Sequence, residues 1–287
     1  MLSAPINSFN EDQKNWYFRL LITAILSDGE VNSAEIVYLQ EVLTAVKNPV
    51  VKKELIQCIE KHQSPELGPA PAFERPVQCA IFIEVVEILI CDVHLAAPEK
   101  LFIRRIADAF NFGEELKKSL LDWAVDGLGW YHTRSYLIHG MRSKAKPISK
   151  IPIEAFNSEQ KYHYALILIS TVLLDNKVDP WEQRYVHQAI SLVDNDAPKD
   201  ELNSYLITKK PPALPSLAAF NHEWKSMILI EVLLMLSVGE KSLPDKSLFY
   251  FHELSEMADY NPEDAEKLIQ WNQRGILWRD KKARLIG

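Results

Sequence analysis

The feature that most constrains the fold of this 287-residue chain is an internal duplication. Matching residues lie 147 positions apart through most of the chain and 148 apart near the end of each half: Phe9 with Phe156, Gln13 with Gln160, Glu84 with Glu231, Trp123 with Trp271, and Trp130 with Trp278. We call such pairs sequence-equivalent. Because the two copies cover almost the whole chain, we predict two domains, residues 1–140 and 153–287, joined by a linker at 141–152.

The spacing of apolar residues within each copy is helical. Leu20, Leu21, Ala24 and Ile25 recur at steps of three and four residues, as do Ile81, Val85, Ile88 and Leu89. Only 9 of the 287 residues are glycine, which suits long helices. The sequence therefore predicts an all-α protein made of two tandem helical bundles with six to seven helices each. A weaker repeat inside each copy predicts two helical hairpins related by pseudo-twofold symmetry.

Charge and motif content exclude several classes of function. The net charge is −7 and both halves are mildly acidic, so we expect no nucleic-acid partner. The few glycines form neither a phosphate-binding loop nor a dinucleotide motif. No pairing of a nucleophile with a base stands out, and we expect no enzymatic activity. The three cysteines, Cys58, Cys79 and Cys91, have no metal-site spacing and are expected to be buried and reduced.

The two most apolar stretches, residues 80–91 and 227–238, are about 12 residues long and contain glutamate. Such stretches are too short and too charged to span a bilayer, for which about 20 apolar residues are needed. The first 15 residues lack the pattern of a secretion signal. We therefore expect a cytoplasmic protein without a transmembrane segment, while peripheral association with a membrane stays open.

Acidic residues recur in the turns between the predicted helices. Three turns follow the pattern Asp-x-x-[Val/Leu]-x-x-x-Glu: Asp28 to Glu35, Asp92 to Glu99, and Asp175 to Glu182. One interpretation is that the glutamates cap helices, since Asn32 with Glu35, and Asp179 with Glu182, have capping-box spacing. The aspartates fit this interpretation less well, because an acid at the end of a helix opposes the helix dipole. A divalent cation held between two hairpins is the other interpretation.

The segment 21–35, LITAILSDGEVNSAE, resembles the TerB-like family of tellurite-resistance proteins, which is related to the N-terminal domain of a membrane-anchored DnaJ-type co-chaperone. The resemblance covers about residues 20–110 and, more loosely, 165–260. It implies a helical bundle, acidic clusters that bind a divalent cation such as Ca²⁺, Mg²⁺ or Mn²⁺, and a role in tellurite or other stress responses. The metal ligands that it implies are Asp28, Glu30, Glu35, Asp92, Glu99, Asp175 and Glu182.

The fourth turn, residues 239–247, departs from this pattern. Gly239 or Glu240 stands in place of the aspartate, and Ser247 stands in place of the glutamate. A metal site in the second copy is therefore less well supported by the sequence. Two functions stay open: a metal-binding stress-response protein, or a metal-free scaffold that binds a protein partner and uses its acids only to cap helices.

Two further repeated features call for a structural role. Glu84 and Glu231 lie within the most apolar segment of each copy, so each carboxylate needs a partner such as an arginine or a backbone group. The motif Trp-x-x-x-Gly-[Leu/Ile]-x-Trp occurs at 123–130 and 271–278. We expect its tryptophans to pack the last helix of each copy onto its bundle, although they could also form an exposed aromatic groove for a partner.

Overall fold

The secondary structure is entirely helical wherever the structure describes the chain, which confirms the all-α prediction. The computed structural model describes residues 4–29, 31, 33–91, 93–140, 151–174 and 178–287. By its internal contacts the chain divides into two units. The first contains the described residues of Met1–Tyr136 and Trp278–Gly287, and the second those of Leu137–Met141 and Lys150–Leu277. The last ten residues thus group with the first unit, whereas the sequence assigned them to the second domain.

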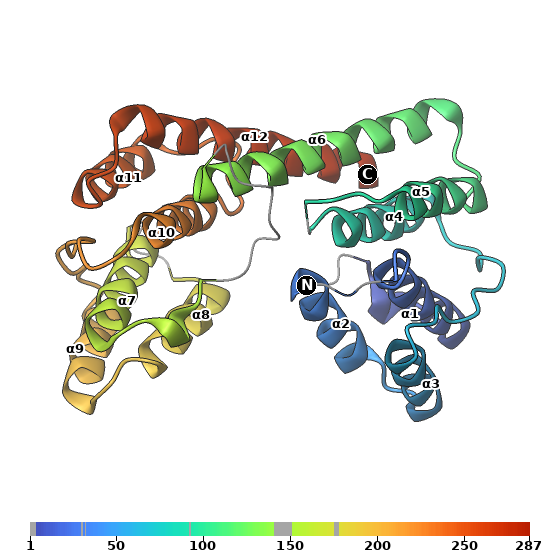
Figure 1. Ribbon diagram of the computed structural model, residues 1–287, viewed down its shortest axis with the longest axis horizontal. Coiled ribbons are helices and arrows are strands. Elements are labelled where there is room, and N and C mark those ends of the chain that lie inside the picture. The colour runs from blue at the N-terminus through green and yellow to red at the C-terminus, as the bar shows by residue number, and fades with distance from the viewer. Residues whose placement is uncertain (1–3, 30, 32, 92, 141–150, 175–177) are drawn as a thin grey trace. The chain divides into compact units, whose positions relative to one another are not determined.

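The first unit is built on two central helices that pack against each other, α1 and α4 (Figure 1). Its helices are α1 (Glu11–Ile25), α2 (Ser33–Ala45), α3 (Pro49–Glu60), α4 (Arg75–Ile90), α5 (Ala97–Ala109) and, as far as Tyr136, α6 (Glu114–His139). Helix α1 also contacts α2 and α3, and α4 also contacts α5. The hairpins α1–α2 and α4–α5 place the first two acidic turns at the points where α1 and α4 end.

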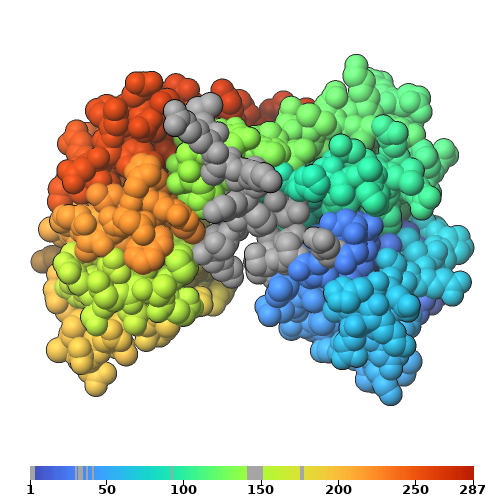
Figure 2. All heavy atoms as spheres, viewed as in Figure 1, coloured from blue at the N-terminus to red at the C-terminus, as the bar shows by residue number. Residues whose placement is uncertain are grey.

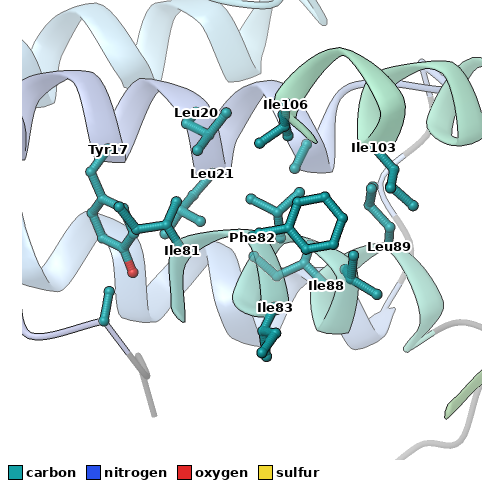
Figure 3. Close-up of a cluster of buried hydrophobic side chains, with 14 of the residues drawn as sticks. Tyr17, Leu20, Leu21, Ile81, Phe82, Ile83, Ile88, Leu89, Ile103 and Ile106 are labelled. Atoms are coloured by element: carbon teal, nitrogen blue, oxygen red, sulfur yellow. The ribbon is translucent and has the colours of Figure 1, made fainter. Parts of the chain in front are cut away.

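The core of the first unit consists of the apolar faces that the helical spacing predicts. Side chains from α1, α4 and α5 gather in this core, and the labelled ones include Tyr17, Leu21, Phe82 and Ile106 (Figure 3). Helix α4 is buried on almost all sides, which explains why its sequence is apolar with no polar face. Each fully buried aliphatic side chain contributes about 1.5–3 kcal/mol relative to an exposed one. The burial of α4 is therefore a main source of stability for this unit.

The second unit has the same order of elements and contains the helix pairs that correspond to those of the first unit, together with one more. Its helices are α7 (Ser158–Val172), α8 (Pro180–Ser191), α9 (Asp196–Thr208), α10 (His222–Leu236), α11 (Asp245–Met257) and, as far as Leu277, α12 (Pro262–Ile286). Helix α7 contacts α8, α9 and α10, and α10 contacts α11. Surface atoms of α7 and α10 lie side by side in Figure 2. Each unit also begins with a short 3-10 helix, η1 (Ile6–Ser8) or η2 (Ile153–Ala155).

A capping box begins the first long helix of each unit. Asn10 Oδ1 accepts a hydrogen bond from the Gln13 N–H at 2.9 Å, and Gln13 Oε1 accepts one from the Asn10 N–H at 3.0 Å. Gln13 Nε2 also donates to the Ala72 carbonyl at 2.8 Å. The sequence-equivalent Gln160 makes the same reciprocal bonds with Asn157 and donates to the Ala219 carbonyl at 2.6 Å. Each glutamine thus fixes both a helix start and the loop before α4 or α10.

No helix in the described part of the chain is both long enough and apolar enough to cross a membrane. Helices α4 and α10 hold the two apolar stretches noted in the sequence. Their side chains are buried in the cores of their own units. Their apolar composition is thus explained by burial within the protein.

Candidate functional site

Among the described residues, one predicted metal ligand lies in a turn and three lie at the starts of helices. Asp28 is exposed in the turn after α1, next to Gly29, whose positive φ of +86° suits the left-handed turn expected there. Glu35 and Glu99 are each only 3% exposed, at the starts of α2 and α5. Glu182 is half-buried at the start of α8. The other three predicted ligands lie outside the described residues: Glu30, Asp92 and Asp175.

The glutamate of each acidic turn occupies the third position of the helix that follows, the position termed N3. Glu99 Oε2 accepts a hydrogen bond from the N–H of Ala96, the N-cap residue of α5, at 2.5 Å. Glu182 Oε2 accepts one from the N–H of Asp179, the N-cap residue of α8, at 2.8 Å. These are the bonds that an N3 glutamate makes in a capping box. Both acids therefore stabilise the starts of their helices.

Within the part of the chain that the structure describes, no three His, Cys, Asp or Glu side chains come close enough together to hold a metal ion. This finding does not cover Glu30, Asp92 and Asp175. The metal site therefore stays a prediction.

The third and fourth turns of the chain meet around a cavity of about 170 Å³ in the second unit. It lies where α7 and α10 end and where α8 and α11 begin. Three acids line it, Asp179, Glu182 and Glu240, together with Ser247 and Thr171. The apolar part of its lining comes from the following residues: Leu174, Trp181, Met235, Leu236, Val238 and Pro244. The degenerate fourth turn, which the sequence marked as a departure from the metal pattern, thus contributes to a cavity.

The glutamates within the two apolar helices, buried Glu84 and half-buried Glu231, are bound by tyrosines. Glu84, 1% exposed, accepts a hydrogen bond from the Tyr17 hydroxyl at 2.7 Å and one from the Ala4 N–H at 3.0 Å. Glu231 accepts one from the Tyr164 hydroxyl at 2.9 Å. Burial, reinforced by the neighbouring carboxylate, raises the pKa of Tyr17 and of Tyr164 far above the usual value. Both tyrosines therefore stay protonated and act as donors.

The tyrosines were missed as partners in the sequence, where an arginine or a backbone group was expected for the glutamates. A signal was present, because Tyr17 and Tyr164 share the offset of 147 residues with Glu84 and Glu231. The backbone part of the expectation holds for Glu84, which binds the Ala4 N–H. Each pair ties α1 to α4, or α7 to α10, across the centre of its unit.

Two tryptophans of the repeated motif pack against each other inside the first unit. The rings of Trp123 and Trp278 stack with centroids 4.8 Å apart. Each indole N–H donates to the backbone carbonyl of the other residue, at 3.1 Å from Trp123 and 2.9 Å from Trp278. Both side chains are buried, as expected for a packing role, but Trp278 packs in the first unit and not on the bundle of its own copy. The contact crosses from the first copy of the motif to the second, which the sequence did not indicate.

Comparison with known proteins gives no relative, since no family model, no curated protein and no solved structure matches this chain.

Proposed function

We propose that this chain is a non-enzymatic protein-interaction scaffold made of two copies of one helical module. The proposal rests on the hydrogen bonds of the acids in the turns. Glu99 and Glu182 each accept a bond from the backbone N–H of the N-cap residue of the helix that they begin. Acids that stabilise helix starts account for the repeated glutamates without a metal. The duplication is supported by the equal order of elements and by the equivalent bonds of Gln13 and Gln160.

Binding of a divalent cation by the first unit is the second candidate, and one observation favours it. Glu35 and Glu99 are both 3% exposed, and their sequence-equivalents, Glu182 and Ser247, line a single cavity. If the first unit has the same arrangement, two buried carboxylates lie near each other. A cation would offset their repulsion and their loss of hydration. This is also the function that the resemblance to the TerB-like family implies.

Thermal unfolding with and without a chelator separates the two functions. The scaffold proposal predicts the same melting temperature in EDTA and in millimolar Ca²⁺, Mg²⁺ or Mn²⁺. A bound ion stabilises the folded state in proportion to the logarithm of its concentration, so metal binding predicts a rise in the melting temperature. Calorimetric titration of the double variant Asp28→Ala/Asp92→Ala gives the control. Heat of binding that wild type shows and this variant loses would favour the metal site and refute the scaffold proposal.

The proposal also covers the partner, the cellular location and the physiological role of the protein. A scaffold requires a protein partner, and the net charge of −7 favours a partner with a basic surface over nucleic acid. Localisation to the cytoplasm and a role in tellurite or other stress responses follow only from the family resemblance and from the sequence expectations. They are tested by localising a tagged chain and by growing a deletion strain on tellurite.

A further inference from the structure

The cavity of the second unit includes a helix position at which the repeated pattern changes. Residue N3 is a glutamate in three helices that follow a turn, α2, α5 and α8, and it is Ser247 in α11. The N-cap residue of α11 is Pro244, which has no backbone N–H for an N3 glutamate to bind. A serine at N3 therefore loses no capping hydrogen bond that a glutamate would make there. Its side chain is also shorter than that of a glutamate and fills less space. The space that it leaves is part of the cavity.

Ser247 is the second feature that marks the cavity as a binding site. Its side chain lines the cavity and the residue is only 7% exposed. Among the residues that the structure describes, its hydroxyl makes no hydrogen bond. The hydroxyl of the neighbouring lining residue Thr171, by contrast, bonds to the Ile167 carbonyl and to Tyr250. Because this hydroxyl lines the cavity and has no partner within the described part of the protein, a ligand in the cavity can bond to it.

The charge of the cavity favours a cation. Helices α7 and α10 end at it and α8 and α11 begin at it, so the opposite partial charges of the helix ends largely cancel. The carboxylates of Asp179, Glu182 and Glu240 therefore make the lining of the cavity negatively charged. The Lys246 ammonium donates to the Leu174 carbonyl. Among the described residues that line the cavity there are three acids and no lysine or arginine.

The size and walls of the cavity favour a cation with an alkyl stem. A volume of about 170 Å³ holds on the order of ten water-sized groups, more than the four methylenes and the ammonium of a lysine side chain. Leu174, Met235 and Val238 offer apolar contact for the methylenes. Trp181 adds an aromatic ring, to which cations are attracted. An ammonium has three donors and no acceptor, which suits an unpartnered hydroxyl and several carboxylates.

We propose that this cavity binds an alkylammonium group, as presented by a lysine side chain of a partner protein. The ammonium binds Ser247 Oγ and the carboxylates of Asp179 and Glu240, and the alkyl stem lies against the apolar wall. This proposal rests on the scaffold function proposed above and names the chemistry that its second unit recognises. The same chemistry is available from a free alkylamine, and the test below distinguishes the two sources.

The test is a titration of the full chain followed by amide NMR. The probes are Nα-acetyl-lysine methylamide, n-butylammonium, and the matched norleucine and arginine derivatives. We expect saturable shifts at Ser247 and Glu240 with the lysine derivative. Tighter binding of n-butylammonium than of the lysine derivative would assign the site to free amines, still within the proposal. Equal binding of the uncharged norleucine derivative, or tighter binding of the arginine derivative, would overturn the alkylammonium assignment.

Three variants complete the test. Ser247→Leu fills the cavity and should abolish the shifts. Glu240→Gln keeps the shape of an exposed side chain and should weaken binding about two- to fivefold, the range for a solvent-exposed charge pair. Glu256→Gln removes an equally exposed acid of α11 that does not line the cavity, and should leave binding unchanged.

If Glu240→Gln and Glu256→Gln behave alike, the cavity is not the site of binding. Far-UV circular dichroism of each variant shows whether it folds, so that Glu240→Gln decides the matter if Ser247→Leu does not fold. Absence of binding combined with a melting temperature indifferent to chelator would refute the cavity proposal alone. The scaffold proposal would then still stand.

Discussion

Replacing Gly127 by alanine is expected to destabilise the first unit, although alanine favours helices. Gly127 lies within α6 and is buried, and a Cβ atom there would lie 2.6 Å from Trp278 Cζ2 and 2.9 Å from Ile90 Cδ1. Real Cβ atoms do not approach other atoms so closely, so a neighbour must move. The Trp278 indole is held by its stack on Trp123 and by its bond to the Trp123 carbonyl. It therefore cannot shift without losing these contacts.

The size of the effect follows from two opposing terms. Gly→Ala within a helix gains about 1 kcal/mol. Overpacking a filled core costs about 1–3 kcal/mol, and the clash with a restrained indole places this case in the upper part of that range. The net result for Gly127→Ala is a loss of about 1–2 kcal/mol. Gly129, two residues along the same helix, has no atom within 4 Å of its hypothetical Cβ, so Gly129→Ala should gain up to about 1 kcal/mol.

Urea unfolding followed by tryptophan fluorescence measures both variants. Because the helix-propensity term is common to the two substitutions, the difference between them isolates the packing cost, about 2–3 kcal/mol. Equal stability of Gly127→Ala and Gly129→Ala would refute the reasoning. It would mean that residues 278–287 do not pack on the first unit in solution as the structure places them.

Three further predictions concern the duplicated contacts. Tyr17→Phe removes a donor from buried Glu84 and should cost about 1–3 kcal/mol in urea unfolding; a cost below about 0.5 kcal/mol would contradict the pairing. Burial raises the pKa of Tyr17 and Tyr164, so the folded chain keeps phenolic protons that the unfolded chain loses near pH 10. Stability should therefore be complete below about pH 10 and fall as the pH rises further, less steeply in Tyr17→Phe, and an unchanged slope would argue against this linkage. Gln13→Ala and Gln160→Ala each remove half of a capping box and should each cost about 0.5–2 kcal/mol, whereas a loss at only one of them would contradict the equivalence of the helix starts.

Much of the helical framework could be predicted from the sequence, because it depends on local patterns. The apolar spacing around Leu20 and Ile81 marks α1 and α4, and the scarcity of glycine allows helices as long as α6 and α12. Helix starts could also be predicted, since Pro180 is favoured at the first position of α8 and Glu182 at its third position has the spacing of a capping box. These signals lie within a few residues of one another.

The contacts that the sequence did not indicate join segments distant in the chain. Trp278 packs on Trp123 across 155 residues, and no periodicity carries that information. The cavity at Ser247 was also unpredicted, because the loss of a glutamate from a pattern does not say whether the space is filled by a neighbour. The offset of 147 residues could have linked Glu84 and Glu231 each to a tyrosine, but a hydrogen bond between two helices depends on how the helices are placed, which the sequence does not give.

The central claim is that the acids of the turns cap helices, and Glu99 tests it most directly. In the presence of EDTA, the free energy of unfolding should fall by about 0.5–2 kcal/mol in Glu99→Ala, which cannot bind the Ala96 N–H. It should stay close to wild type in Glu99→Gln, whose amide oxygen can accept the same bond. A Glu99→Gln variant as unstable as Glu99→Ala, together with a wild type that loses stability in EDTA, would contradict the account, because the negative charge and a bound cation would then be what stabilises the turn.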